Sequence, residues 1–460
     1  MAWAPDLSAF PGPIYQGIAA ALSRDIETGR LKAGDRLPPQ RALAAALGVD
    51  LTTVTKAYNE VRKLGLIEGG GRRGSFVRAV PLSPFPQAEA AVVETGMNLP
   101  PQPAGGSLAA CLREGYAALL AAPDAAMKLQ YQPSGGAMAD RAAGAALLRG
   151  RGLEAPEECV LVTAGSQNAL HAIVSTAFRA GDVVCLGAHA YPGFVSVARR
   201  YGIELVAIAA DGEGLLPEAL AAAADERPVR GVYVVPTNDN PTAATMGLAR
   251  RRALAAVAAA RGIEIVEDDA YGMLPAAPLP ALASFAPELT WHIASLTKIV
   301  SPALRVAYVC APSAKKAWRL AADVHETAIM APPLNAALAT RWIGDGTLPR
   351  LIAQVRAEAM LRQSLAARIL SGIPYRAHPE GYHLWLPVPV GASPAHVVNT
   401  LRPAGISVVA SEDFAVDPGP TPPALRVSIG GSLSHERLTS ALKMLDVLLD
   451  QGTERKTTLV

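Results

Sequence analysis

The chain is 460 residues long, 50% hydrophobic and 18% charged, so it is too long for one ordinary domain and too apolar to be disordered. Long uncharged runs such as Gly96–Leu112 and Tyr271–Pro287 contain prolines, which excludes membrane-spanning helices there. The N-terminus lacks the pattern of a secretory signal and the four cysteines lack metal-ligand spacing, so we expect a cytoplasmic protein without a metal. Residues 1–78 hold eleven Lys/Arg and seven Asp/Glu, a net charge of +4 against +2 for the whole chain. This asymmetry favours an N-terminal part that binds nucleic acid, although a solvated basic surface would give the same count.

The first predicted domain runs from residue 12 to residue 78. Apolar residues recur at helical spacing from Ile14 to Ile26, and Asp50 can cap a later helix. The predicted elements are helices at Ile14–Ile26, Arg41–Leu47 and Leu51–Leu64, followed by strands at Leu66–Glu68 and Ser75–Val77. Three helices followed by a β-hairpin predict a winged helix-turn-helix domain.

Residues 79–106 contain six prolines and little periodicity, so we expect a linker there. From Ser107 onward, short apolar runs alternate with alanine-rich helical stretches such as Leu248–Ala260. The apolar runs are Val160–Val162, Val183–Leu186, Ile203–Ile208, Gly231–Val235, Ile263–Val266, His292–Ala294 and Val306–Cys310. Runs of this kind, joined by helices, indicate a mostly parallel buried sheet. We therefore expect an α/β domain over residues 107–460, with a seven-stranded large part at about 125–330 and a small α+β part at about 331–460.

Polar residues follow four of the predicted strands, at the carboxyl ends where ligands bind in α/β sheets. The segment Thr163–Gln167 opens a helix whose free N–H groups and positive dipole end suit a phosphate. The other three segments are Asn240-Pro241-Thr242, Glu267-Asp268-Asp269-Ala270-Tyr271 and Ser295-Leu296-Thr297-Lys298, with Arg305 seven residues later. Taken singly, each has a simpler explanation, such as a turn or a surface lysine. Their order along the chain is what favours a single site.

This order, ending in Arg426-Val427-Ser428, resembles that of the fold-type I aminotransferases from about Ser107 to Leu449. The resemblance implies pyridoxal 5'-phosphate as cofactor, held as a Schiff base by Lys298, because lysine supplies the required amine. Asp268 matches the carboxylate that keeps the pyridine nitrogen protonated, and Asp269 is the neighbouring alternative, expected to point away. The remaining matches are Asn240 and Tyr271 at the ring hydroxyl, Tyr191 stacked on the ring, and Gly165, Ser166, Gln167, Ser295 and Arg305 around the phosphate.

The resemblance also implies an effector site and a dimer. Arg426 matches the arginine that grips the α-carboxylate of an amino acid through a bidentate pair. Tyr131 resembles the tyrosine that reaches the phosphate of the neighbouring subunit, which requires a homodimer. The sequence departs from the family at Ala243, where a glycine is usual after Asn-Pro-Thr. This departure puts the geometry of the Asn240 contact in doubt.

Residues 14–77 resemble the winged-helix domain of the GntR regulators. The matching segments include Gly34-Asp35-Arg36-Leu37-Pro38, Arg41-Ala42-Leu43-Ala44 and Gly74-Ser75-Phe76-Val77. The resemblance implies that the third helix enters the major groove and the wing meets the minor groove of double-stranded operator DNA. The implied DNA-binding residues are Arg41, Thr52, Thr53, Lys56, Arg72, Arg73 and Gly74. Leu51 stands where the family commonly has arginine, so one expected contact is missing.

A GntR domain joined to an aminotransferase domain is the architecture of the MocR (GabR-like) regulators. We therefore expect a pyridoxal-phosphate-dependent transcription regulator that senses an amino compound, or the cofactor itself, by Schiff-base (aldimine) chemistry. We expect a head-to-tail homodimer. One alternative is a working aminotransferase that carries a DNA-binding domain, and residual transaminase activity fits either interpretation. Another is a GntR repressor with a cofactor-free relic domain, which the retained lysine set disfavours.

Overall fold

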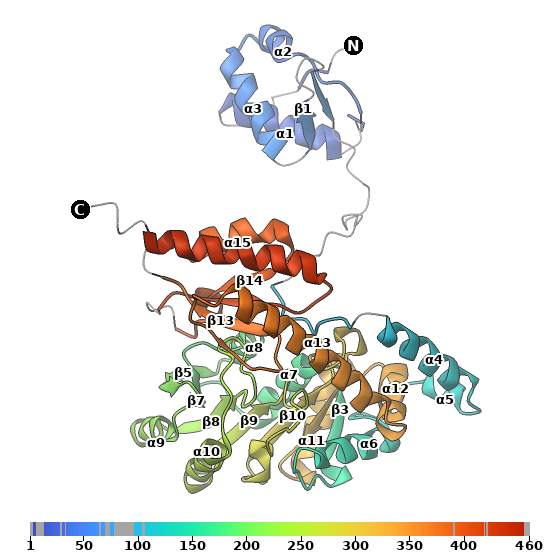
Figure 1. The fold of residues 1–460 in the computed structure, drawn as a ribbon. Helices are drawn as coiled ribbons and strands as arrows, with labels where there is room; N and C mark the ends of the chain where they lie inside the picture. Colours follow the sequence, from blue (N-terminus) through green and yellow to red (C-terminus); the bar gives the residue numbers. More distant parts are fainter. Residues whose placement is uncertain are drawn as a thin grey trace. The chain divides into compact units, whose positions relative to one another are not determined.

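We describe a computed structural model of the chain over residues 3–5, 13–27, 30–32, 34–63, 66–69, 74–77, 96–103, 106–389, 392–417, 419 and 422–454. The chain forms two compact units, residues 1–91 and 92–460, each described here by itself (Figure 1). No helix in these described ranges has the length and apolar character needed to span a membrane.

The first unit consists of three helices and a hairpin. The helices are α1 (Ile14–Glu27), α2 (Gln40–Leu47) and α3 (Leu51–Lys63), and the strands β1 (Ile67–Gly69) and β2 (Ser75–Val77) pair antiparallel. The apolar face of α3 packs on α1 and α2, with Val54 and Tyr58 fully buried between them. The Thr52 N–H donates to Asp50 Oδ1 at 2.7 Å, so Asp50 caps α3 as predicted. The predicted winged helix-turn-helix is confirmed.

The second unit is built on a seven-stranded sheet with the order β3-β11-β10-β9-β8-β4-β5. Neighbouring strands are parallel except where β11 lies antiparallel between β10 and β3. The strands are β3 (Val160–Thr163), β4 (Val183–Gly187), β5 (Glu204–Ile208), β8 (Val229–Val234), β9 (Glu264–Asp268), β10 (Thr290–Ser295) and β11 (Ala307–Cys310). This strand order and these pairings confirm the prediction of a mostly parallel, seven-stranded α/β sheet. Most of its strands are buried and apolar, as expected of a parallel sheet.

Helices α7 (Ser166–Ala177), α8 (Pro192–Arg200), α9 (Pro217–Glu226) and α10 (Leu248–Arg261) connect strands of this sheet (Figure 1), with a short hairpin of β6 (Ala210–Asp211) and β7 (Gly214–Leu215). Helices α4 (Ser107–Ala121), α5 (Ala125–Lys128) and α6 (Met138–Arg149) precede the first strand, and α11 (Ala314–Ala328) and α12 (Pro333–Gly344) follow the last. Helix α7 starts directly after β3 and contacts β3, β9, β10 and β11. Its N-terminus therefore lies at the carboxyl edge of the sheet, where the polar segments that follow β8, β9 and β10 begin.

The C-terminal part is a smaller α+β layer. Its strands β12 (Arg376–Ala377), β13 (His383–Pro387), β14 (Ser407–Ala410) and β15 (Ala424–Ser428) form an antiparallel sheet in the order β12-β13-β15-β14. Helices α13 (Thr347–Ile369), α14 (Pro394–Leu401) and α15 (His435–Glu454) pack with this layer. Arg426 lies on the central strand β15, so this layer supplies one wall near the site.

Residues 96–103 precede α4 and belong to the second unit. The Gly431 N–H donates to the Leu99 carbonyl at 3.0 Å, and the Gln102 N–H donates to the Gly431 carbonyl at 3.2 Å. A β-carbon at Gly430 would lie 1.8 Å from the Leu99 oxygen, so this close approach of two backbones requires glycine. The expected linker of residues 79–106 thus overlaps the second unit, because Pro100, Pro101 and Pro103 lie in a segment that backbone hydrogen bonds hold to Gly431.

Candidate functional site

The predicted cofactor residues meet in one cavity at the carboxyl edge of the seven-stranded sheet. Its lining combines the segments that follow β8, β9 and β10 with the N-terminus of α7. The lining residues are Met97, Ser166, Gln167, Tyr191, Val235, Asn240, Asp268, Ala270, Tyr271, Ser295, Thr297, Lys298 and Arg305. Of the predicted cofactor residues, Gly165 caps α7 beside the cavity, and Tyr131 lies elsewhere, on the surface and 80% exposed.

Lys298 is half-buried and held by the chain itself. Its Nζ donates to the Asn98 carbonyl at 2.6 Å, and its own carbonyl accepts from the Tyr382 hydroxyl at 2.6 Å. Burial lowers the pKa of Lys298 to about 8, and the nearby charge of Arg426 adds to this effect. A lysine with such a pKa supplies a neutral, nucleophilic amine much closer to neutral pH than an exposed lysine does.

Asp268 ends β9 and offers one unsatisfied oxygen. The Tyr233 hydroxyl donates to its Oδ2 at 3.1 Å, whereas its buried Oδ1 has no partner among the described residues. Burial raises the pKa of Asp268 to about 6, so the group is ionised at neutral pH. A buried acceptor without a donor is costly, and the protonated nitrogen of a pyridine ring is a donor of the right charge. Asp268 therefore fits the carboxylate that pyridoxal phosphate requires.

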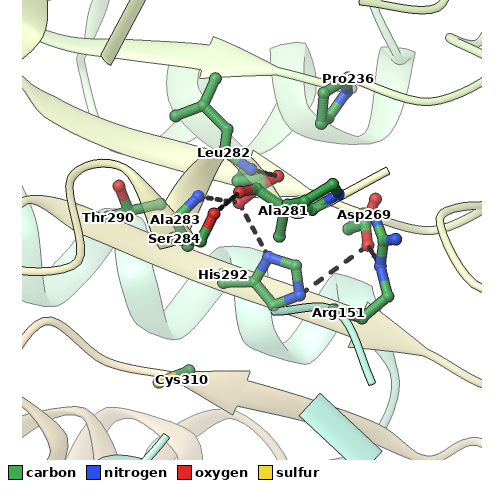
Figure 2. A network of polar contacts seen from close by, with 12 residues as sticks. Arg151, Pro236, Asp269, Ala281, Leu282, Ala283, Ser284, Thr290, His292 and Cys310 are labelled. Atoms are coloured by element: carbon green, nitrogen blue, oxygen red, sulfur yellow. Dashed lines mark hydrogen bonds and ion pairs between the residues drawn. The ribbon is translucent and has the colours of Figure 1, made fainter. Parts of the chain in front are cut away.

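Asp269 does not line the cavity and lies in a buried network with Arg151 and His292 (Figure 2). Its Oδ2 lies 2.8 Å from Arg151 Nε and 3.9 Å from His292 Nε2, and His292 Nδ1 lies 2.9 Å from Glu267 Oε2. Burial opposes ionisation of Asp269, but the charges of Arg151 and His292 outweigh it and lower the pKa of this carboxyl. The positive charges of the network thus compensate the negative charge of Asp269. Of the two aspartates, only Asp268 lines the cavity.

The residues predicted to bind the phosphate lie around the N-terminus of α7. Gly165, the N-cap of α7, has φ +81°, and a β-carbon there would lie 3.2 Å from the Arg305 guanidinium carbon. Arg305 itself has φ +47° and donates through Nη2 to the Ala164 carbonyl at 3.0 Å. A guanidinium beside the free N–H groups of a twelve-residue helix makes a favourable site for a phosphate dianion. Ser295 lines the same cavity and accepts from the Thr297 N–H at 3.2 Å.

The two tyrosines and Asn240 line the middle of the cavity. The Tyr191 hydroxyl donates to Gln167 Oε1 at 3.3 Å, and the Tyr271 hydroxyl accepts from Asn98 Nδ2 at 2.9 Å. Asn240 Oδ1 accepts from Arg426 Nη1 at 3.3 Å. Ala243 takes the left-handed conformation expected of the usual glycine, with φ +55°, so the turn after Asn240 is kept despite the substitution.

Arg426 is 2% exposed and lies over the Phe414 ring, 5.3 Å from its centroid. Its Nη2 donates to the Gly96 carbonyl and also lies 3.4 Å from Ser407 Oγ. A carboxylate can bind this buried guanidinium only if it competes with the oxygen atoms that already accept from it.

Asn98 is a site residue that the sequence interpretation missed. It is 1% exposed, and its Oδ1 accepts from the Ser428 hydroxyl at 2.7 Å. Its Nδ2 contacts the Tyr271 hydroxyl and also lies 3.0 Å from His383 Nδ1. The only signal in the sequence was a polar residue between Met97 and Leu99, which the neighbouring prolines led us to place in a linker.

The predicted DNA-contacting residues lie on the first unit. Arg41, Thr52 and Lys56 are exposed on α2 and α3, and Thr53 is half-buried. The Thr52 hydroxyl donates to Asp50 Oδ1 at 2.6 Å, which reinforces the helix cap, and its oxygen can still accept a hydrogen bond. Arg72 and Arg73 lie outside the described residues.

A groove runs beside this surface, between α2 and the hairpin. It is lined by Pro38, Pro39, Gln40, Arg41, Leu51, Arg62, Gly69, Gly74 and Ser75. Gly74 has φ +102°, and a β-carbon there would lie 3.3 Å from Arg36 Nε. Arg36 and Arg62 are thus two further basic residues at the wing that the sequence interpretation did not select.

The fold and the cavity together define a class: proteins with an aminotransferase-type fold on the same chain as a winged helix-turn-helix. Comparison with known families agrees. Residues 104–445 match the family "Aminotransferase class I and II", and residues 14–77 match "Bacterial regulatory proteins, gntR family".

Two relatives match over most of their length. The uncharacterized HTH-type transcriptional regulator YdeF of Bacillus subtilis is 31% identical over 457 residues, which is 98% of each chain. The HTH-type pyridoxine biosynthesis transcriptional regulator PdxR of Corynebacterium glutamicum is 27% identical over 79% of this chain and 80% of its own length. The chain therefore belongs to the family of HTH-type transcriptional regulators that join a gntR-family domain to an aminotransferase class I and II domain, which confirms the predicted regulator family.

A solved structure matches the second unit in particular. LysN, the α-aminoadipate aminotransferase from Thermus thermophilus, complexed with N-(5'-phosphopyridoxyl)-L-leucine, has a TM-score of 0.68 and 26% identity. The match covers 80% of this chain and 96% of that chain. It confirms the predicted aminotransferase fold.

Proposed function

We propose that the protein is a pyridoxal-phosphate-dependent transcription regulator that senses a small amine bearing a carboxylate and changes its affinity for operator DNA in response. The observation that carries this proposal is the buried Oδ1 of Asp268, which has no partner among the described residues and lies in one cavity with Lys298 and the N-terminus of α7. When bound, pyridoxal phosphate supplies an aldehyde that captures amines and a ring that withdraws electrons. A gntR-family domain on the same chain turns such capture into a signal.

The predicted cofactor residues divide the binding of the cofactor among them in this proposal. Lys298 anchors the cofactor through its amine, and the Asp268 carboxylate accepts a hydrogen bond from the protonated ring nitrogen. Asn240 and Tyr271 orient the ring hydroxyl, and Tyr191 covers the ring face. The phosphate is held by Gly165, Ser166, Gln167, Ser295 and Arg305, through helix N–H groups, hydroxyls and one guanidinium.

The effector class follows from Arg426. A buried guanidinium near an amine-capturing lysine selects amines that also carry a carboxylate. The α-aminoadipate substrate class and the phosphopyridoxyl-L-leucine ligand of the structural relative support an α-amino acid. The name of the pyridoxine-biosynthesis regulator supports a second candidate, the cofactor itself.

Operator binding belongs to the first unit. We assign Lys56, Thr52 and Thr53 to the major groove, because they lie on the first turns of α3. Arg41 supplies a phosphate contact from α2, and the wing residues Arg72, Arg73 and Gly74 reach the minor groove. A protein that regulates transcription in this way acts in the cytoplasm.

The second unit is proposed to form a homodimer with a head-to-tail arrangement. Large apolar side chains are exposed near Tyr131, on α4, α5 and the start of α6. They are Leu120, Met127, Leu129 and Met138, and their exposed fractions of 52–78% suit burial against a second copy. Tyr131 then completes the phosphate site of the partner. Analytical ultracentrifugation checks this proposal, and a cofactor-loaded monomer at micromolar concentration would contradict it.

The decisive experiment measures operator affinity with and without L-2-aminoadipate, on a duplex selected from a random-sequence library. The wild-type protein is expected to change its affinity by about 5- to 150-fold, the range of ordinary allosteric coupling. Arg426→Ala is expected to lose this response, whereas Arg437→Ala, an exposed arginine on α15, should keep it. Equal responses in both variants would refute the role of Arg426.

An active aminotransferase is the second candidate, because Lys298, Asp268, Tyr271 and Arg426 are all present. The same samples separate the two functions if 2-oxo acid formation is followed alongside operator binding. Rapid multiple turnover, with no effect of the amino acid on DNA affinity, would favour the enzyme.

A further inference from the structure

The first described segment of the second unit accepts hydrogen bonds from two groups that are proposed to bind the cofactor and the effector. We call Gly96–Leu99 the entry segment, because it is the first described part of the chain after β2. The Gly96 carbonyl accepts from Arg426 Nη2, and the Asn98 carbonyl accepts from Lys298 Nζ at 2.6 Å. The amine anchor and the carboxylate anchor are thus both bonded to backbone oxygens that lie two residues apart.

Asn98 fastens the same segment to the walls of the site. Its side chain connects the Ser428 hydroxyl on β15 with the Tyr271 hydroxyl after β9 and with His383 on β13. Because it is 1% exposed, these contacts are shielded from water and hold their geometry. The entry segment is therefore attached to the large sheet and to the C-terminal layer at once, with Met97 in the cavity wall.

We propose that the entry segment is an internal competitor of the effector, with Asn98 as the positioning residue, and that ligand binding releases its Gly96 end. This inference rests on the proposed function. A carboxylate bound to Arg426 competes with the Gly96 carbonyl, because a bidentate carboxylate needs guanidinium N–H groups that the Gly96 and Asn240 oxygens now accept from. Attachment of the cofactor to Lys298 would likewise use the amine that now donates to the Asn98 carbonyl. The Asn98 side-chain contacts involve neither anchor, so they hold the segment as a pivot.

The consequence is a longer stretch of chain between β2 and the part of the second unit that stays in place. In the sequence, 18 residues, 78–95, lie between the last residue of β2 and Gly96. Release of Gly96 and Met97 would lengthen this connection by up to about 7 Å, at about 3.3–3.6 Å per residue. The length of the connection affects the effective concentration of one unit near the other, and this would link the site to operator binding.

Gly96 provides a lever that touches no side chain of the site. Its φ of +67° is a left-handed conformation that glycine adopts easily and alanine does not. Among the described residues a β-carbon there would meet Val409, at an ordinary 3.8 Å, so Gly96→Ala strains the backbone without a clash with them. Gly106→Ala is the matched control, because Gly106 has φ +66° and a β-carbon there would meet no described atom within 4 Å.

The experiment uses cofactor-loaded, full-length protein and a panel of L-amino acids that includes L-2-aminoadipate. The cofactor absorbance reports affinity, and hydrogen–deuterium exchange reports the amides of residues 96–99. In the wild type, the amino acid with the largest spectral response should speed exchange in this segment, and Gly96→Ala should bind it about fivefold more tightly than wild type. Gly106→Ala should match the wild type in both measurements.

Two results separate the possible failures. An Arg426-dependent spectral response, with unchanged exchange at residues 96–99 and unchanged affinity in Gly96→Ala, overturns the internal competitor and leaves the proposed function standing. No spectral response to any amino acid of the panel overturns both the carboxylate-sensing role of Arg426 and the competitor.

Discussion

The depressed pKa of Lys298 makes a quantitative prediction about how the protein acquires its cofactor. An amine attaches to an aldehyde only when it is neutral, and burial lowers the pKa of Lys298 from 10.5 to about 8. At pH 7.5 about 24% of the side chain is then neutral, against about 0.1% for an ordinary lysine. The fraction available for attachment is therefore higher by roughly 240-fold. The rate should rise with pH and level off above about pH 8.

The assay mixes apoprotein with pyridoxal phosphate between pH 6 and 10 and traps the attached fraction with borohydride. Arg426→Gln provides the perturbation, because the positive charge of Arg426 lowers the pKa of Lys298 and its removal should move the midpoint of the rate profile upward. Arg437→Gln, on the exposed face of α15, serves as the control and should leave the midpoint in place. A wild-type midpoint near 10.5, or a downward shift in Arg426→Gln, would refute the argument from burial.

Three further predictions concern the charges described above. Asp268→Asn should weaken pyridoxal phosphate binding at pH 7.5 by at least about tenfold in a fluorescence titration, and wild-type binding should weaken as pH falls through about 6, where Asp268 takes up a proton. Arg41→Ala and Lys56→Ala should each flatten the dependence of log affinity for operator DNA on log salt by up to about one unit, and unchanged slopes would show a different docking surface. Arg151→Met should cost about 3–5 kcal/mol of unfolding free energy in urea titrations because it leaves Asp269 buried and unpaired, and adding Asp269→Asn should recover part of this loss.

The parallel sheet could be predicted from the sequence because its signal is local. Each strand is a short run that is apolar on both faces, and each polar segment follows its strand directly. The carboxyl edge of a parallel sheet then brings Asp268 and Lys298 together without further information.

Asn98 could not be found in this way, because its role depends on distant partners. The hydrogen-bonding groups that surround it belong to residues 173, 285 and 330 positions away in the chain. A proline-rich neighbourhood reads locally as a linker, and only the packed C-terminal layer shows that the segment is fixed. Arg36 was missed for the same reason, since its closeness to Gly74 arises from the folding of the wing.

The alternation of side chains at the end of β9 has a consequence for alignment errors in the sheet. Glu267 and Asp269 lie on the side of His292 and Asp268 lies on the side of the cavity, so a slip of one position would move either Asp269 or Glu267 into the place of Asp268. Either slip would still present a carboxylate to the cavity, so the identity of this residue alone discriminates poorly against it. The hydrogen bonds of Glu267 discriminate well, because its carboxylate accepts from the N–H groups of Leu282 and Ala283 at 2.7 and 2.8 Å in the native register. The register that places Asp268 in the cavity wall is thus favoured by a glutamate that does not line the cavity.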